Sequence, residues 1–441
     1  MNLLSSNVNK TYFTLLISAL SSTILMTVYS TVDIICVGQY LGPLGSATVA
    51  CINPFWTLMI APGVLLGIGG AVMMSNRRGA NDEESARKYF TVSASLSVLC
   101  AIAIFLVFSF FMEELLSFFG AEGDTLREGL KYMEPIKYAA PTFTLCACIS
   151  TFIRNDGEAF LPTFATAVGG ILNIIGDIFF VFDFGLGLGI YGAGLATSSS
   201  QIISFLIIMT YFLRKKCKLK FTKIDKLASR LYRIISVGLS VFLMEVSIGL
   251  VSVFFNKTIT ENLGSLHLAI YGTVSTVTVL LQSLFNTLGS ALQPVASAGY
   301  GAKNYTRVKT VFRTAVLCAI GLGLIFTLFT QLFPLEILKA YIDVNDGVVS
   351  VGPSVLRKYT LAIGISGISI VISYYLQSIL KRVMSISISF CRGLVFPCLF
   401  ALLLTKLFNV NAIWYAVPLS ELFTLAVSLV FVMCSRKELK N

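Results

Sequence analysis

The chain has little charge and few of the residue types that bind metals or carry out acid–base chemistry. Asp, Glu, Lys and Arg make up 12% of its 441 residues, and there is one histidine, His267. A single histidine cannot form a zinc H-E-x-x-H pair, and the ten cysteines contain no C-x-x-C pair. Neither a G-x-x-x-x-G-K-[ST] loop nor a nucleophile elbow occurs. We therefore expect a protein that is not an enzyme, needs no cofactor and does not itself hydrolyse ATP.

Long apolar segments are abundant. Hydrophobic residues form 56% of the chain, and the mean hydropathy is +0.83. A membrane-spanning helix needs about 20 apolar residues. Twelve segments meet that length: 12–37, 47–75, 89–111, 132–153, 162–182, 190–213, 234–256, 268–296, 312–333, 355–380, 386–408 and 412–434. Because every connection is short, the sequence predicts an all-α integral membrane protein of twelve transmembrane helices in a lipid bilayer.

The basic residues are unevenly distributed along this topology. The net charge is +11, and 24 of the 33 Lys and Arg residues lie on the side that carries both termini. This asymmetry follows the positive-inside rule, so we expect both termini in the cytoplasm. The densest basic run, 214–233, joins spans six and seven and is expected to meet anionic lipid. We expect no nucleic-acid partner.

The two halves of the chain resemble each other at an offset of 222 residues. Ser75, Gly79 and Ala80 correspond to Ser297, Gly301 and Ala302, in a shared S-x-x-x-G-A pattern after spans two and eight. Six spans per half give both halves the same orientation, so we expect two pseudo-symmetric six-helix lobes. The predicted organisation is an N-terminal lobe (1–213), a basic linker (214–233) and a C-terminal lobe (234–441).

Two carboxylates lie within apolar spans of the first half. A charge at bilayer depth is costly, so Asp33 and Asp177 are candidates for a functional site. Asn173 lies four residues before Asp177, on the same helix face. Such a group can bind and release protons, or its oxygens can form a cage for a small cation. The alternative is a protonated aspartate that only packs helices.

The second half offers a different set of polar residues at depth. Glu245 lies centrally in span seven and is expected to face positively charged substrate or serve in coupling. Glu421 is more typical of a packing residue, and Arg392 can pair with a carboxylate or reach toward the interface. An adaptable apolar pocket could be lined by aromatic and methionine side chains. The candidates are Tyr29, Phe55, Met59, Tyr138, Phe242 and Met244, each of which could instead be packed or lipid-facing.

Several motifs together resemble the multidrug and toxic compound extrusion (MATE) family over essentially the whole chain. They are Thr31-Val-Asp33-x4-Gly38-x3-Gly42, the S-x-x-x-G-A pattern, Arg154-Asn-Asp-Gly157, Asn173-Ile-Ile-Gly-Asp177 and Gly192-Ala-Gly-Leu-Ala-Thr197. The turn at 154–157 and Arg392 before Pro397 are most similar to the bacterial MepA-like and DinF-like branches.

The resemblance implies two six-helix lobes around a cavity that faces alternately inward and outward. It also implies export of organic, often cationic, compounds in exchange for Na⁺ or H⁺. The family positions that match a coupling site are Asp33, Asn173, Asp177 and Thr197, and Glu245 matches an acid of another branch. That branch's second acid has no counterpart, because residues 355–380 contain no Asp or Glu.

These observations predict a secondary active transporter of small molecules in the cytoplasmic membrane, acting as a monomer. The closest rival is a flippase for lipid-linked oligosaccharides or polysaccharides from the same superfamily. A flippase would favour a strongly cationic cavity, whereas this chain offers only Arg392, and Lys137 if it lies deep enough, beside several acids.

Overall fold

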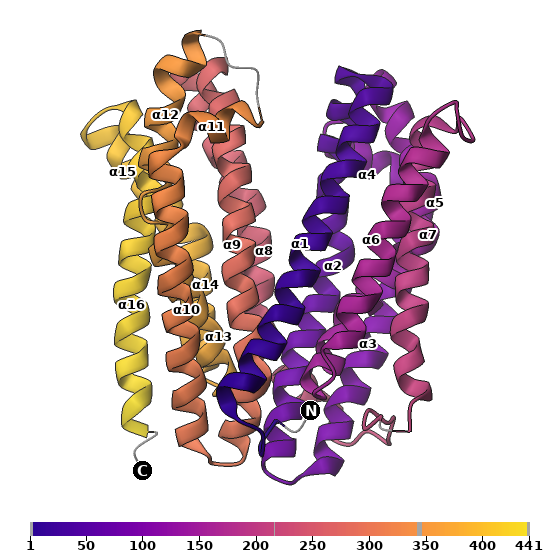
Figure 1. Cartoon of the computed structure of the whole chain (residues 1–441), viewed down its shortest axis with the longest axis vertical. Coiled ribbons are helices and arrows are strands. Elements are labelled where there is room, and N and C mark those ends of the chain that lie inside the picture. Colours follow the sequence, from indigo (N-terminus) through magenta and orange to yellow (C-terminus); the bar gives the residue numbers. More distant parts are fainter. Residues whose placement is uncertain (1–2, 216, 342–345, 439–441) are drawn as a thin grey trace. The chain divides into compact units, whose positions relative to one another are not determined.

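The computed structural model describes residues 3–215, 217–341 and 346–438, and all regular secondary structure in these ranges is helical (Figure 1). The first half contains α1 (Val8–Leu41), α2 (Pro43–Gly79), α3 (Glu83–Phe110), α4 (Met112–Phe118), α5 (Gly123–Asn155), α6 (Phe160–Val181), α7 (Gly189–Met209) and the 3₁₀ turn η1 (Thr210–Leu213). The second contains α8 (Leu227–Leu263), α9 (Ser265–Gly301), α10 (Tyr305–Leu332), α11 (Pro334–Lys339), α12 (Asp346–Thr360), α13 (Ile363–Ser378), α14 (Arg382–Phe390), η2 (Cys391–Val395), α15 (Phe396–Leu407), η3 (Val410–Tyr415) and α16 (Ala416–Glu438).

Within these described ranges, 12 helical segments are long and apolar enough to cross a membrane, which confirms the predicted fold class. The tenth span is made of two helices, α12 and α13, and begins eight residues earlier than the hydropathy pattern suggested. The eleventh is α14 and α15 joined by a π-helical turn, η2, which contains Arg392. A π turn inserts one extra residue per turn and often marks a functional position.

The 222-residue repeat of the sequence recurs in the local structure. Helices α2 and α9 are each 37 residues long, α3 and α10 are each 28, and each pair is offset by 222. Asp82 and Asn304, at the same offset, each cap the following helix by accepting a backbone N–H three residues on. Asn81 and Lys303 before them both have positive φ, at 60° and 56°. The duplication therefore extends to capping and turn geometry.

The chain forms two compact units. Unit 1 is built mainly from Ile17–Gly238, and unit 2 from Leu4–Leu16 and the described residues from Leu239 onward. Residues 4–16 belong to unit 2 because Tyr12 is fully buried there and its hydroxyl donates to the Leu288 carbonyl at 3.4 Å. The first turns of α8 belong to unit 1. The lobe limits predicted from the sequence stay a prediction.

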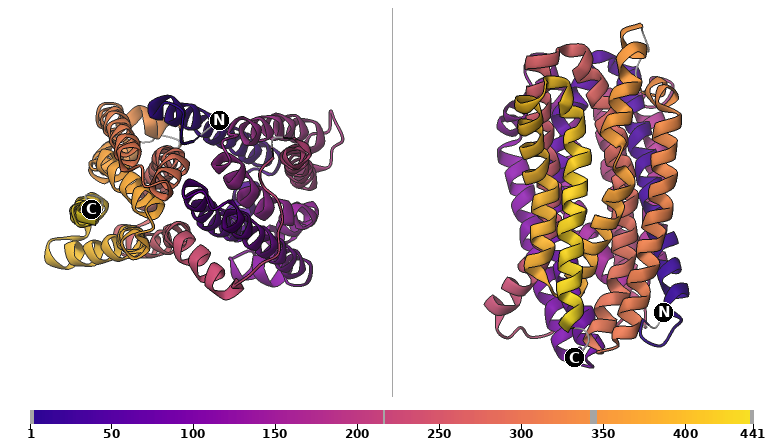
Figure 2. Two further views of the ribbon diagram at one scale, coloured as in Figure 1. Left: turned by 90° about the horizontal axis from the view of Figure 1, so that it is seen from below. Right: turned by 90° about the vertical axis from the view of Figure 1, so that its left-hand side faces the viewer.

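In unit 1, α2 packs along α5 and α6 packs along α7 (Figure 1). Gly176 permits the close approach of α6 to α7, since a Cβ there would lie 2.8 Å from Cβ of Ala196. An apolar core between α2, α3 and α5 includes Phe55, Met59 and Phe108. In unit 2, α13 packs against α9 and α10, and α15 lies beside α16 (Figure 2).

Candidate functional site

Four helices of unit 1 bring polar side chains together at bilayer depth. Asp33 comes from α1, Tyr132 from α5, Asn173 and Asp177 from α6, and Thr197 from α7. Asp177 is fully buried, and Asn173 is 2% exposed. Their four-residue spacing on a continuous helix places both side chains on the face of α6 that packs inward. The structure thus brings the four residues expected at the coupling site into one unit and adds Tyr132.

Two hydrogen bonds orient this cluster. The Tyr132 hydroxyl donates to Oδ2 of Asp33 at 2.9 Å, and Nδ2 of Asn173 donates to Oγ1 of Thr197 at 3.1 Å. Because the Asn173 amide uses its nitrogen toward α7, its oxygen is left free. Asp33 and Asp177 are close enough for their charges to interact, and Tyr132 interacts with both.

The cluster has more acceptors than donors. Among the residues that the structure describes, no donor reaches Oδ1 of Asp33, Oδ1 of Asn173 or either carboxylate oxygen of Asp177. A buried polar atom without a partner costs about 1–3 kcal/mol, and more when it is charged. Oxygen atoms of carboxylate, amide and hydroxyl groups are ligands for hard cations, and a carboxylate can also take a proton. The residues present therefore fit a small cation or a proton.

A transition-metal centre is a poorer fit. Nowhere in the described ranges do three or more His, Cys, Asp and Glu side chains gather in a way that could hold a metal ion. The cluster has only two carboxylates, and its remaining ligand atoms are neutral oxygens. Such oxygen atoms are ligands for hard cations, whereas transition metals favour the nitrogen and sulfur ligands of His and Cys.

The predicted apolar pocket residues of unit 1 divide into two groups. Phe55 and Met59 are completely buried in the core, and the Phe55 ring contacts Phe108 edge-on at 5.3 Å. The structure assigns both to packing rather than to a pocket wall, because their helix face meets α3 and α5. Tyr29 packs on α6, where a Cβ at Gly170 would lie 2.9 Å from its ring. Tyr138 is 62% exposed and lies under the Lys137 ammonium.

In unit 2, the structure resolves the role of Arg392. Its Nε donates to both carboxylate oxygens of Glu421, at 3.0 and 3.1 Å, and both side chains are buried. Its Nη1 lies 3.5 Å from the Met244 sulfur. Glu421 is therefore an ion-pair partner and not only a packing residue, and Arg392 is neutralised inside unit 2.

Glu245 has no such partner within the described part of the chain. It is exposed on α8, and the neighbouring Phe242 and Met244 are half-buried. His267, at the start of α9, has Nδ1 3.0 Å from the Leu263 carbonyl and its ring stacked on Trp414. This arrangement matches a capping histidine.

Sequence reasoning missed Tyr132, and it anticipated a carboxylate partner for Arg392 without identifying Glu421. Tyr132 lies in a stretch with several charged residues near the start of α5, so its depth was not evident from hydropathy. The Arg392–Glu421 pair joins residues 29 positions apart on different helices. The only features of the sequence that could have suggested this pair are that both residues are charged, lie within apolar spans and belong to the same half of the chain.

Comparison with known proteins gives consistent results. The MatE family model matches residues 19–179 and 239–403, one segment in each half. A Bacillus subtilis (strain 168) relative, "Probable multidrug resistance protein YoeA", is 26% identical over 340 residues, covering 75% of this chain and 73% of its own length. "Multidrug export protein MepA" of Staphylococcus saprophyticus is 23% identical over 412 residues, covering 91% and 89%.

Solved structures share the fold. One, described as the "Outward-facing conformation of a multidrug resistance MATE family transporter of the MOP superfamily", has a TM-score of 0.91 and 23% identity, covering 99% of this chain and 98% of its own. A second, a MOP superfamily transporter from Pyrococcus furiosus for which a binding pocket of reverse polarity is described, has a TM-score of 0.90 and 23% identity, covering 100% and 98%. At this identity the likeness shows the fold alone.

Proposed function

The chain belongs to the MatE family of multi-pass membrane transporters, and from this premise we propose that it exports organic, cationic or amphipathic compounds by antiport with Na⁺ or H⁺. The observation that carries the proposal is the set of unpartnered oxygens of Asp33, Asn173 and Asp177 in unit 1. Spare acceptors at bilayer depth are costly, and a cation or a proton that joins them offsets this cost.

The chain's own residues account for the coupling. Asp33 and Asp177 repel each other when both are ionised. The hydrogen bond from Tyr132 stabilises negative charge on only one of their four oxygens, Oδ2 of Asp33. A bound Na⁺ or proton would supply the missing positive charge. Because the residues come from α1, α5, α6 and α7, a change in their charge alters how these helices pack. A ligand shifts a conformational equilibrium only by its difference in affinity between two states, so the site must differ between them.

Substrate chemistry is supported by unit 2 and by the relatives. The names of the curated relatives refer to multidrug export and multidrug resistance. Glu245 offers an exposed carboxylate without a basic partner among the described residues, beside the apolar Phe242 and Met244. A carboxylate next to flexible apolar side chains suits an amphipathic cation.

The ion pair of Arg392 favours the exporter over the flippase alternative. A flippase needs free cationic groups to bind a pyrophosphate. The charge of Arg392 is instead compensated by Glu421, whose Oε1 lies 3.0 Å from Nε of Arg392. Lys137 lies over the exposed Tyr138 ring. We propose a monomeric exporter of the cytoplasmic membrane with cytoplasmic termini, as the basic side of the topology favours. The terminal residues 1–2 and 439–441 lie outside the described ranges.

Reconstituted vesicles test the coupling. Dye efflux is measured with a Na⁺ gradient at constant pH, and separately with a pH gradient in the absence of Na⁺. One gradient should drive efflux, and Asp177→Asn should abolish that response. Asp183→Asn, an exposed aspartate in the turn after α6, is the matched control and should behave like the parent. If neither gradient drives efflux, or if Asp177→Asn leaves it unchanged, the proposed coupling is wrong.

A second experiment tests the substrate class. Glu245→Gln removes one negative charge with little change in volume. It should reduce export of a cationic dye by roughly tenfold, the equivalent of about 1.4 kcal/mol, while a neutral dye of similar size is much less affected. Equal losses for both dyes would assign Glu245 to packing or coupling instead.

A further inference from the structure

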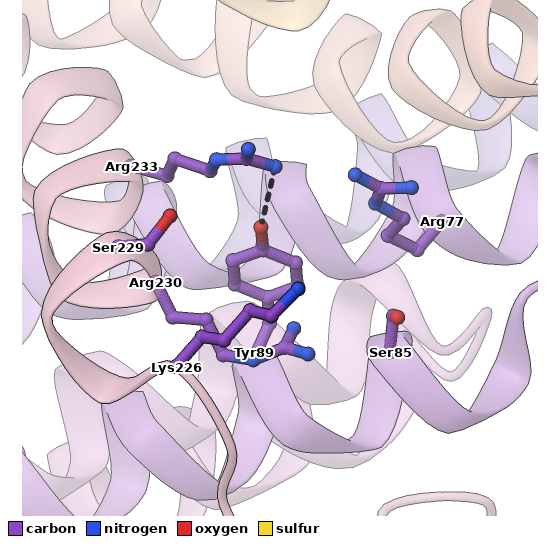
Figure 3. A pocket seen from close by; sticks show the side chains of 7 residues that line it. All are labelled: Arg77, Ser85, Tyr89, Lys226, Ser229, Arg230 and Arg233. Carbon is purple, nitrogen blue, oxygen red and sulfur yellow. Dashed lines mark hydrogen bonds between the residues drawn. The ribbon is translucent and has the colours of Figure 1, made fainter.

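Unit 1 contains a second polar site that the transport proposal does not use. It is a pocket of about 220 Å³ formed where α2 ends and α3 and α8 begin (Figure 3). Every charged side chain in its lining is cationic: Arg77, Lys226, Arg230 and Arg233. The remaining lining residues, Ser85, Tyr89 and Ser229, carry hydroxyl groups.

The cations converge on one aromatic ring. Tyr89 is 1% exposed, and its hydroxyl accepts a hydrogen bond from Nη1 of Arg233 at 3.4 Å. The Arg230 guanidinium lies 5.0 Å from the Tyr89 ring centre. Figure 3 shows the Arg233 guanidinium at this hydroxyl, the Arg77 guanidinium across the pocket from Arg233, and the Lys226 ammonium beside the ring. The pocket therefore offers hydrogen-bond donors and positive charge in one place.

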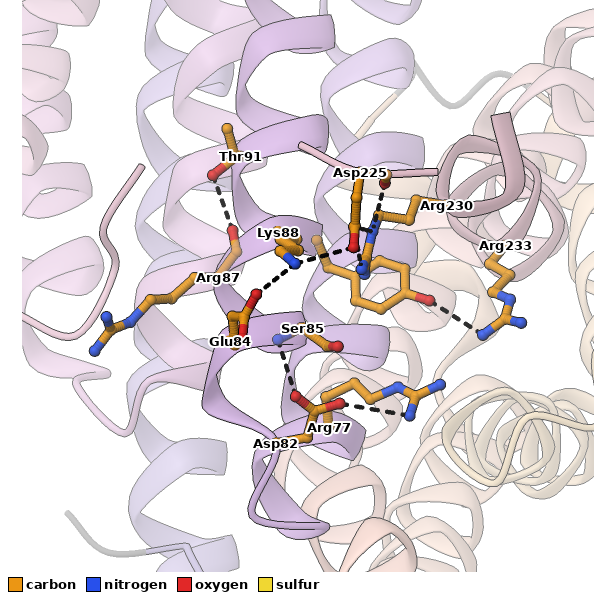
Figure 4. A network of polar contacts seen from close by, with 11 residues as sticks. Arg77, Asp82, Glu84, Ser85, Arg87, Lys88, Thr91, Asp225, Arg230 and Arg233 are labelled. Atoms are coloured by element: carbon orange, nitrogen blue, oxygen red, sulfur yellow. Dashed lines mark hydrogen bonds and ion pairs between the residues drawn. The ribbon is translucent and has the colours of Figure 1, made fainter. Parts of the chain in front are cut away.

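Two of the four cations are already held by carboxylates, as Figure 4 shows. Asp225 accepts hydrogen bonds from Nη2 of Arg230 at 2.6 Å and from Lys88 at 3.0 Å. Asp82 lies 3.7 Å from Arg77. Lys226 and Arg233, by contrast, have no carboxylate within ion-pair distance in the described ranges. These two provide the uncompensated charge.

The depth of the pocket indicates what kind of anion can reach it. Arg77 lies in the last turn of α2, and Lys226 immediately precedes α8. Arg233 and Tyr89 lie six residues into their helices, about 9 Å along the axis. The headgroup layer on each side of a bilayer is roughly 5–8 Å thick. Because α3, with 28 residues, is longer than the ~20 needed for the hydrocarbon core, it is long enough for its first turns to lie in that layer.

We propose that this pocket binds the phosphate group of an anionic membrane lipid. Guanidinium, ammonium and hydroxyl groups are the donors that a phosphodiester needs, and basic pockets between transmembrane helices bind such headgroups. Lys226 and Arg233 supply the binding charge, while Asp225 keeps Arg230 in position. A bound lipid would join α3 to the start of α8 and so stabilise unit 1 where the basic linker enters it.

The test compares two double variants of equal charge in the purified full-length protein. Lys226→Gln with Arg233→Gln removes the two unpaired pocket cations. Lys220→Gln with Lys223→Gln removes two exposed cations from the same linker, outside the pocket lining. Binding of phosphatidylglycerol, and of phosphatidylcholine with the same acyl chains, is measured in detergent by native mass spectrometry and by the shift in the thermal unfolding midpoint.

Phosphatidylglycerol should bind and stabilise the parent, and phosphatidylcholine should not. The pocket variant should bind phosphatidylglycerol roughly ten- to thirty-fold more weakly, since each interfacial cation contributes a factor of about five or slightly less. The linker variant should bind it like the parent. Equal losses in the two variants would reduce the effect to general surface charge and overturn the proposal.

Two further measurements keep the test decisive. Thermal unfolding without added lipid shows whether the pocket variant folds. If the double variant does not fold, the single variant Lys226→Gln, at an exposed position, is used in its place. Inorganic phosphate is titrated in parallel. One result would overturn the lipid assignment: inorganic phosphate raises the unfolding midpoint of the parent but not that of the pocket variant, and phosphatidylglycerol changes neither. The pocket would then bind a soluble phosphate.

Discussion

The Tyr132 hydroxyl donates a hydrogen bond to Oδ2 of Asp33 at 2.9 Å, and within the described residues this is the one donor that reaches that carboxylate. The bond joins α5 to α1 across the candidate coupling site. Tyr132 thereby sets the position of one acidic oxygen and leaves the other, Oδ1, as a buried acceptor without a partner among the described residues.

Removing this hydroxyl should therefore destabilise the protein. Tyr132→Phe leaves Asp33 with two unpartnered oxygens, and the loss of a hydrogen bond to a charged group costs about 1.5–3 kcal/mol. Chemical unfolding in mixed micelles measures the change. Tyr138→Phe, on the same helix but 62% exposed, is the control and should stay within about 0.5 kcal/mol of the parent. Equal changes in the two variants would show that Asp33 does not depend on Tyr132.

The buried Arg392–Glu421 pair gives a second prediction. Replacing one partner leaves a charge buried without compensation, so Arg392→Met or Glu421→Gln alone should cost about 3–5 kcal/mol. The double variant Arg392→Met with Glu421→Leu should cost less than either single change, because the remaining charge is also removed. Unfolding of all three variants provides the measurement.

An exposed pair serves as the comparison. Arg127 lies 2.9 Å from Asp124, and both side chains are about two-thirds exposed. Arg127→Met should change stability by less than about 1 kcal/mol. If the Arg392 and Arg127 variants lose equal stability, the Arg392–Glu421 pair is solvated in the working protein. The prediction that it stabilises unit 2 as a buried ion pair is then wrong.

Hydropathy predicted the twelve spans found in the described ranges, and matching motifs predicted the offset between the halves, because these depend on local composition and length. The same reasoning brought Asp33 and Asp177 forward, since a carboxylate is conspicuous in an apolar segment. It could not assign Phe55 and Met59 to the core, because an apolar helix has no polar face to reveal its orientation. The hydrogen bond from Tyr132 depends on how α5 packs, which no local pattern encodes.

Asp225 should hold the linker in place over the whole physiological pH range. Hydrogen bonds from Lys88 and Arg230 lower the pKa of Asp225 to about 2, from its usual 3.8. A group whose pKa is lower in the folded state stabilises the fold above its ordinary pKa, and this contribution is lost as pH falls toward 2. Hydrogen exchange of residues 217–226, corrected for intrinsic rates, should therefore be constant between pH 8 and pH 5.

The matching variant is Asp225→Asn, which removes at every pH the carboxylate that Lys88 and Arg230 share. Lys88 keeps its ion pair with Glu84, and Arg230 keeps its hydrogen bond to the backbone carbonyl of residue 225. It should raise exchange across residues 217–226 at neutral pH, whereas Asp183→Asn, in an exposed turn, should not. Unchanged exchange in Asp225→Asn would mean that other contacts hold the linker.

The approach of α6 to α7 gives the last prediction. A Cβ on Gly176 would lie 2.8 Å from Cβ of Ala196 and 3.2 Å from its Cα, so Gly176→Ala must move the helices apart. Such overpacking costs about 1–3 kcal/mol. Because Asn173 lies on α6 and Thr197 follows Ala196 on α7, the 3.1 Å bond between them should lengthen and break.

Gradient-driven efflux should therefore fall in Gly176→Ala, although no ionisable group has changed. The control is Gly321→Ala on α10, where a Cβ would meet nothing within 4 Å. Alanine is intrinsically the better helix former, by up to about 1 kcal/mol, so this variant should be as stable as the parent or more so and should transport normally. Opposite signs for the same substitution would show that the helix contact, and not helix propensity, sets the geometry of the site. If both variants are stabilised and active, the contact between α6 and α7 can accommodate a methyl group at residue 176. The position of Asn173 then does not depend on Gly176.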